Sequence, residues 1–341
     1  MRSRRASPSD GSKRWRWQGP GAGTSLVVAF AFVCASASRL GAAEALATPP
    51  PATVIVPFAI DESAARWAHA TVPMHMAPLD RLRRLSRALL DPALRPIAEA
   101  AHTSTASDVF GERRANCVGY ANLFVGLARE LGVAAYFVLV DGLPASGGTS
   151  ADESLAVREG HLAAAWGPAV DRRIFDLAGE TPGTRLRVRP ITDLAAIAVF
   201  YSNRGVEALL DGRTGDAVDW LRIAAELEPT ALPSTWINLG VALRRNGDLE
   251  AANEAYQRAL ELDPGGAPAY RNLAALLVLR GRGREAAELL DTAAAIAGTE
   301  ARLDSLAALR LAQQRLLAGH LQEARGLYSR ALEGAQVAPR R

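Results

Sequence analysis

The C-terminal part of the chain repeats itself, and this repetition limits the possible folds more than any other feature of the sequence. From about residue 199 to 335, small and aromatic residues return every 34 or 35 positions. In the middle copy they are Trp236, Gly240, Leu243, Ala252, Tyr256, Ala259 and Pro264. Small residues at fixed positions let paired helices approach closely, and a single copy cannot bury its apolar face. We therefore predict about four helical hairpins that stack into an all-α solenoid.

This pattern resembles the tetratricopeptide repeat (TPR), and the middle copy matches it at every signature position. Asn203, Asn238 and Asn272 occupy the same position in the first three copies, whereas the fourth copy has Arg310 there. The resemblance implies that such asparagines face a concave groove and bind an extended peptide, because an amide both donates and accepts hydrogen bonds. The alternative is that they only bond neighbouring helices. Both roles stay open for these three partner-binding candidates.

A helix with a cysteine in its first turn is predicted upstream of the repeats. Apolar and small residues from Cys117 to Leu131 fall on one helical face. Asn116 stands where an N-cap belongs, and Gly132 where a helix-ending glycine belongs. Unpaired backbone N–H groups and the helix dipole stabilise a thiolate at that end. Cys117 is therefore a candidate nucleophile, although a free cysteine is also a common buried core residue.

Two further residues complete a possible catalytic set. His161 lies in a strand-like run, 160–166, and Asp176 lies near the end of the next run, 172–177. A nucleophile, a base and a carboxylate that orients the base are what thiol acyl transfer requires. We predict that two antiparallel strands set His161 beside Asp176, while the helix presents Cys117 across a cleft. A cysteine helix followed by antiparallel strands is an α+β layout.

The order and context of these residues resemble the transglutaminase-like cysteine superfamily, which shares the catalytic logic of papain. The residues that carry the resemblance are 116–120, 127–133, Gly160-His161 with Trp166, and 175–177. It implies a papain/transglutaminase-like α+β domain in which Cys117, His161 and Asp176 are catalytic. The backbone N–H of Cys117, with Asn116 as second choice, is the candidate oxyanion donor. Transglutaminase-like domains followed by TPR repeats also resemble a recurrent bacterial architecture.

Other kinds of site have little support in the sequence. His69, His75, His102 and His320 have no accompanying residues of a catalytic set, so surface or structural roles are expected for them. Scattered histidines and a single cysteine after residue 43 provide no metal-ligand spacing. The glycine pair at 147–148 is not followed by a helix start, as a phosphate-binding loop would require. We expect neither a metal nor an organic cofactor.

The first 43 residues are predicted to be a secretory signal peptide. A basic stretch precedes the apolar run 26–34, and small residues follow at 41–43. The run is too short to span a bilayer, so no membrane span is expected after cleavage, with an uncleaved N-terminal anchor as the alternative. The chain has 39 basic and 36 acidic residues, but seven basic residues and one acidic residue lie in this leader. The remainder is mildly acidic, which argues against a nucleic-acid partner.

Together these features predict an exported protein of the periplasm or cell envelope with two domains. The predicted segments are a signal peptide at 1–43, a tether at 44–53, a transglutaminase-like domain at 54–198, TPR repeats at 199–335 and a tail at 336–341. The leading hypothesis is thiol-dependent acyl transfer or amide hydrolysis, with a solenoid that binds a peptide or protein. The rival hypothesis is a non-enzymatic envelope adaptor with a vestigial cleft and TPR-mediated protein binding.

Overall fold

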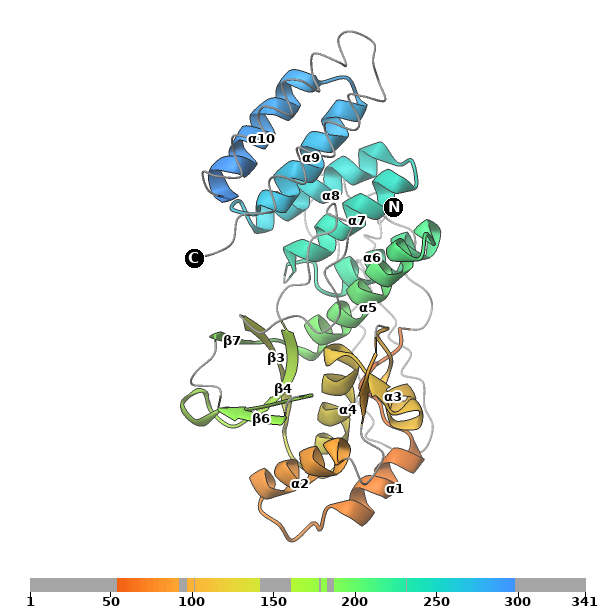
Figure 1. The fold of residues 1–341 in the computed structure, drawn as a ribbon, viewed down its shortest axis with the longest axis vertical. Coiled ribbons are helices and arrows are strands. Elements are labelled where there is room, and N and C mark those ends of the chain that lie inside the picture. Colours follow the sequence, from red (N-terminus) through yellow and green to blue (C-terminus); the bar gives the residue numbers. More distant parts are fainter. Residues whose placement is uncertain are drawn as a thin grey trace, which may run out of the picture.

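The computed structural model describes residues 54–91, 97–100, 102–141, 161–177, 179–182, 187–230 and 232–297. The predicted signal peptide, tether, fourth repeat and tail lie outside these residues. Figure 1 shows an elongated molecule, with four helices and a sheet at one end and a stack of helices leading away from them. We call the described residues before 193 the cysteine domain and those from 193 onward the solenoid.

Four helices form one side of the cysteine domain, and three of them begin directly after a residue whose side chain caps the helix. Asp61 caps the first helix by accepting a hydrogen bond from the Ala64 N–H. Thr105 and Asp108 form a reciprocal capping box at the third. Such caps satisfy backbone donors that have no partner inside the helix. The helices are α1 (Glu62–Thr71), α2 (Pro78–Leu90), α3 (Ala106–Glu112) and α4 (Cys117–Glu130).

Helix α4 is the centre of the cysteine domain. Its first twelve residues, 117–128, are all buried, so it is enclosed on every side. A Cβ atom added at Gly126 would collide with the carbonyl oxygen of Phe58, which explains the glycine there. Gly132 adopts φ +71° just after the helix, a conformation that glycine tolerates best. The predicted helix start and stop signals are both confirmed.

Five antiparallel strands pack against α4 in the order β6-β5-β4-β3-β7. The predicted strand-like runs 160–166 and 172–177 form β4 and β5, and β6 and β7, which were not predicted, lie at the two edges of the sheet. Side chains alternate between the faces, so Phe137, Leu162 and Phe175 pack toward α4 while Val138, Ala163 and Ile174 form a small cluster on the other face. The strands are β3 (Tyr136–Asp141), β4 (His161–Trp166), β5 (Arg173–Asp176), β6 (Gly179–Pro182) and β7 (Arg187–Pro190). A short parallel pair joins β1 (Ala98–Glu99) to β2 (Arg114–Ala115).

The described part of the solenoid consists of three helical hairpins, as the repeat pattern predicts. The helices are α5 (Asp193–Leu210), α6 (Thr214–Leu227), α7 (Pro233–Arg245), α8 (Leu249–Leu262), α9 (Ala267–Leu279) and α10 (Gly283–Ala297). A Cβ atom at Gly205 would overlap Leu221, and one at Gly240 would overlap the ring of Tyr256. The small residues are therefore needed where paired helices touch.

The two parts share one hydrophobic core. Helix α5 begins at Asp193, with Thr192 as its N-cap, so the predicted boundary after residue 198 falls inside a single helix. The reason is that the first turns of α5, including Phe200 and Tyr201, pack into the core of the cysteine domain. The Tyr201 hydroxyl also accepts a hydrogen bond of 2.7 Å from the backbone of Ile55. No flexible linker separates the two parts in the described chain.

A candidate thiol site between the sheet and the solenoid

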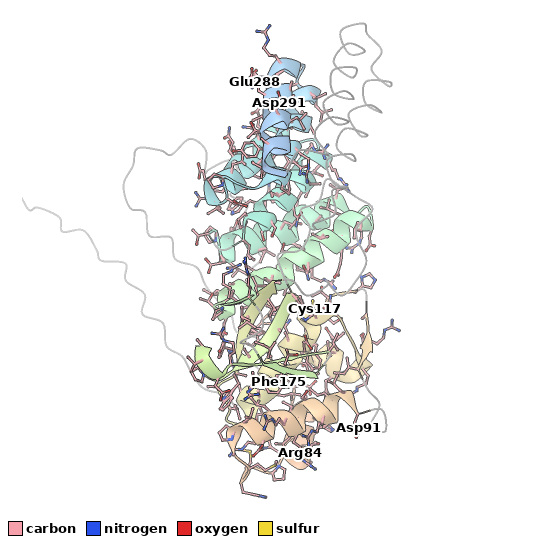
Figure 2. All side chains as sticks on the ribbon, turned by 60° about the vertical axis from the view of Figure 1, so that its left-hand side comes forward. Arg84, Asp91, Cys117, Phe175, Glu288 and Asp291 are labelled. Carbon is pink, nitrogen blue, oxygen red and sulfur yellow. The ribbon has the colours of Figure 1, made fainter. Side chains whose placement is uncertain are left out.

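Cys117 is the first residue of α4 and lies at the end of that helix nearest the solenoid (Figure 2). It is a free thiol with 6% of its surface exposed. Asn116 holds the first turn of the helix in place, because its side-chain oxygen accepts the Gly119 N–H at 2.9 Å. The structure therefore confirms the predicted placement of the cysteine at a capped helix start, where backbone donors stabilise a thiolate.

His161 and Asp176 meet across neighbouring strands. His161 is the first residue of β4 and Asp176 the last of β5, and both are nearly buried. The register pairs Ala164 with Phe175, so the first residues of β4 lie beside the end of β5. His161 Nε2 and Asp176 Oδ2 are 3.4 Å apart. The predicted pairing of base and carboxylate is therefore present in the structure.

The surroundings of His161 favour its charged form. Burial by itself would lower its pKa, but the Asp176 carboxylate and the neighbouring Cys117 outweigh burial and raise the pKa to about 9. The 3.4 Å separation is long for a hydrogen bond, and neither ring nitrogen makes one of ordinary geometry within the described residues. The close Asp176 carboxylate nevertheless favours an imidazolium ion near neutral pH.

An aromatic stack fixes α4 against the strand that carries Asp176. The Phe124 ring stacks on Phe175 with the ring centroids 4.9 Å apart, and on Tyr120 at 5.9 Å. Phe175 directly precedes Asp176, and Tyr120 lies one turn beyond Cys117. Burial, more than the nearby Asp176 charge, raises the pKa of Tyr120, so its hydroxyl stays neutral. The stack therefore holds α4, which carries the thiol, against β5, which carries the carboxylate.

A small pocket lies over Cys117, and the solenoid forms one of its walls. Its volume is about 30 Å³, enough for a water molecule or a narrow chemical group. Among the described residues, none of those that line it carries a charge. The lining residues are Cys117, Val118, Leu162, Val199, Ser202, Asn203, Val206, Leu232, Ser234 and Asn238. Sequence analysis did not predict that α5 and α7 would close the thiol site, although two of its three asparagines are part of this wall.

The three asparagines have different surroundings. Asn203 and Asn238 line the pocket over Cys117, with Asn203 partly exposed and Asn238 only 3% exposed. Asn272 is 5% exposed and donates a 3.0 Å hydrogen bond to the carbonyl oxygen of Pro268 in its own helix. It is not among the pocket residues. The structure therefore brings two of the three to the thiol and leaves the third within the helical stack.

None of the other described histidines lines the thiol pocket. His69 pairs with Glu130 at 3.1 Å on the surface, and His102 Nδ1 lies 3.8 Å from Glu207. His75 is exposed, and His320 lies outside the described residues. Among the described residues, no group of three or more His, Cys, Asp or Glu side chains is placed to hold a metal ion. None of the described helices is long and apolar enough to cross a membrane.

Asn116 has a structural use for its side chain. Its oxygen accepts the Gly119 N–H, and its amide nitrogen donates to Thr103 Oγ1 at 2.7 Å. These bonds weigh against Asn116 as the oxyanion donor and leave the backbone N–H of Cys117 as the better candidate. Thr103 was not among the residues that the sequence analysis singled out.

Comparison with known proteins identifies both parts of the chain. The transglutaminase-like superfamily matches residues 66–165, and a tetratricopeptide repeat matches residues 233–265. The TPR repeat-containing protein PA4299 of Pseudomonas aeruginosa is 36% identical over 121 residues, which are 35% of this chain and 46% of that protein. The photosystem I assembly protein Ycf3 of Rippkaea orientalis is 31% identical over 118 residues, or 32% of this chain and 68% of that protein.

Solved structures of MamA also resemble part of the chain. One is 24% identical and covers 40% of this chain and 77% of its own, with a TM-score of 0.31. The present chain spans less than half the length of the Pseudomonas aeruginosa relative. The two domain matches occur in the order that the sequence predicts. The chain belongs to the tetratricopeptide repeat proteins, and it carries a domain of the transglutaminase-like superfamily ahead of its repeats.

Proposed function

We propose that the protein performs thiol-dependent acyl chemistry on amides of a peptide or protein that its solenoid binds. The observation that carries this proposal is the meeting of Cys117, His161 and Asp176 from three separate elements beside a pocket. TPR repeats in this chain and in its relatives support the binding of a protein partner. The described residues that line the pocket are uncharged and suit an amide group, which carries no charge itself.

The proposed reaction has two steps. The sulfur of Cys117 attacks the amide carbonyl carbon, the C–N bond breaks, and the leaving amine takes a proton from protonated His161. Water or a second amine then gives its proton to His161 and attacks the thioester, which releases Cys117. Asp176 faces Nε2, so Nδ1 is the ring nitrogen that exchanges protons with sulfur and substrate. Hydrolysis follows when water attacks, and amide transfer follows when an amine attacks.

An acyl-trapping experiment tests this proposal. The protein is incubated with dimethylated casein and a biotinylated alkylamine, and acid-quenched samples are analysed by intact mass spectrometry and streptavidin blotting. We expect an acyl adduct on Cys117 and either labelled or cleaved casein. Cys117→Ala and His161→Gln should abolish both signals. His69→Gln is the matched control, because it also removes a histidine next to a carboxylate, at an exposed pair. Equal signals from Cys117→Ala and the parent protein would contradict the proposal.

A second candidate is a non-enzymatic adaptor whose cleft is closed. The observation in its favour is that Cys117 is 6% exposed below a pocket of about 30 Å³. An adaptor would bind its partner equally well with Cys117→Ala and would show no acyl adduct. Affinity capture with the parent protein and this variant, followed by the adduct assay on captured partners, separates the two functions.

We further propose that the protein is exported to the periplasm or cell envelope. The predicted signal peptide at 1–43 supports this location. Cell fractionation and mass spectrometry of the mature N-terminus provide the test. A chain that begins near residue 44 in the envelope fraction is expected, and a full-length chain in the cytoplasm would exclude export.

A further inference from the structure

We propose that the solenoid positions the nucleophile through a buried chain of hydrogen bonds from Glu207 to Thr103 to Asn116. This inference rests on the proposed function, because it assigns Glu207 and Thr103 as positioning residues for the thiol site. Neither residue lines the pocket. Both act through the cap of α4, which directly precedes Cys117.

The first link joins α5 to the loop that follows β1. Glu207 is 7% exposed, and its Oε1 atom accepts the Thr103 N–H at 2.7 Å. Arg204, one turn earlier in α5, donates from Nη1 to the Thr103 carbonyl oxygen at 3.3 Å. Thr103 is wholly buried, so water cannot replace these partners. Helix α5 therefore holds both backbone polar groups of Thr103.

The second link joins Thr103 to the cysteine helix. Its hydroxyl oxygen accepts a 2.7 Å hydrogen bond from the Asn116 side chain, which is itself 1% exposed. The Asn116 oxygen then accepts the Gly119 N–H at 2.9 Å and closes the first turn of α4. Because Asn116 directly precedes Cys117, its position sets the direction of the first turn and therefore of the sulfur.

The same helix also reaches the pocket. Asn203 and Glu207 are four residues apart in α5, so they lie on one face of that helix. Asn203 lines the pocket over Cys117, while Glu207 bonds Thr103. An occupant that shifts α5 through Asn203 therefore also acts on the hydrogen bonds that place the thiol. His102 Nδ1 lies 3.8 Å from Glu207 Oε2, and Arg204 binds the Thr103 carbonyl oxygen.

Thr103→Val is the main test, because valine keeps the shape of threonine and removes the acceptor for Asn116. The measurement is the second-order rate of Cys117 alkylation by iodoacetamide, in the full folded chain, from pH 5 to 9. We expect the rate at pH 6 to fall about tenfold and the pH profile to move toward that of His161→Gln. Thr103→Ser, which keeps the hydroxyl, should restore most of the rate and the profile.

Two further variants separate positioning from loss of stability. Thr105→Val removes a side-chain cap from α3, two residues away, so it should lower thermal stability without changing the alkylation profile. Glu207→Ala deletes the far end of the chain and should reproduce the Thr103→Val profile, whereas Glu207→Gln keeps an acceptor oxygen and should not. If Thr103→Val does not fold, Glu207→Ala and Glu207→Gln decide the question.

The outcome distinguishes this inference from the proposed function. Wild-type alkylation profiles in folded Thr103→Val and Glu207→Ala would overturn the positioning role, even if His161→Gln still lowered the rate. A His161→Gln variant with a wild-type profile would instead contradict the proposed function. Equal losses in Glu207→Ala and Glu207→Gln would show that the Glu207 charge, and not its hydrogen bond to Thr103, controls the thiol.

Discussion

The solenoid and the cysteine domain are built from contacts of different range. In the solenoid, Gly205 and Gly240 each face a side chain sixteen positions later, so the same contact is remade in successive repeats. In the cysteine domain, Gly126 meets the backbone of Phe58, and Thr103 bonds Glu207 of the solenoid across 104 positions. The repeated part can therefore absorb a local change, whereas the thiol site depends on distant segments that all have to be in place.

The largest expected effect is on the alkylation rate of Cys117, and it distinguishes the buried histidine–carboxylate pair of His161 from the exposed pair of His69. His161→Gln should lower the alkylation rate of Cys117 at pH 6 about 100-fold, because the thiolate loses its imidazolium partner. His69→Gln removes an exposed pair with Glu130 and should change the rate less than about twofold. Iodoacetamide kinetics on the purified variants provide the measurement. Similar alkylation rates for both variants would contradict the prediction that His161, and not His69, controls the reactivity of Cys117.

The pH dependence of stability tests the same pair in the resting protein. The pKa of His161 is raised from 6.5 to about 9, so folding favours its protonated form. The stabilisation is complete below pH 6.5 and is lost as the pH rises through about 9. The free energy of unfolding of the wild type should exceed that of His161→Gln by up to about 3 kcal/mol at pH 6. Most of this difference should be gone at pH 10. Urea unfolding at several pH values measures it, and a pH-independent difference would contradict this prediction.

Three glycine substitutions compare the packing of the two parts. Gly126→Ala should destabilise the protein by about 2–3 kcal/mol, because the new methyl group meets a backbone carbonyl that cannot rotate away. Gly240→Ala meets the buried Tyr256 ring, which can shift slightly, and should cost about 1–2 kcal/mol. Gly111→Ala is the control, since nothing lies within 4 Å of its Cβ position. The midpoints of urea unfolding rank the three variants by their loss of stability. A larger loss for Gly240→Ala than for Gly126→Ala would contradict the prediction.

The smallest expected effects concern the asparagines. Asn203→Ala with Asn238→Ala should weaken partner binding, since each lost hydrogen bond contributes about 0.5–1.5 kcal/mol. Asn272→Ala should instead lower stability by a similar amount, because its amide bonds the Pro268 carbonyl. Pull-down from envelope extract and thermal melting measure the two properties. Weaker binding by Asn272→Ala at unchanged stability would favour a continuous asparagine groove.

Local signals made much of the fold and the catalytic set predictable. Asn116 and Gly132 mark the ends of the cysteine helix, and the repeat spacing locates Gly240 at a helix contact. These features depend on neighbours in the sequence or on a fixed period. Strand β7 and the bond from Thr103 to Glu207 gave no such signal, because both depend on segments far apart in the chain. Nothing in the sequence indicated that the solenoid forms a wall of the thiol pocket. Asn203 and Asn238 were predicted to bind a partner, but not to lie close to Cys117.

The shared core determines how this protein can be divided or transplanted. A fragment that ends at residue 198 would cut α5 and lose Phe200 and Tyr201. The core residues of the cysteine domain that these two side chains cover would then be exposed. Ile55 would also lose the Tyr201 hydroxyl, its hydrogen-bond partner in α5. The smallest portable unit that keeps the thiol pocket intact therefore extends through α7, to about residue 245. Exchanging the repeats after residue 245 would change the surface that binds a partner, while the part of the chain that forms the thiol pocket would be kept.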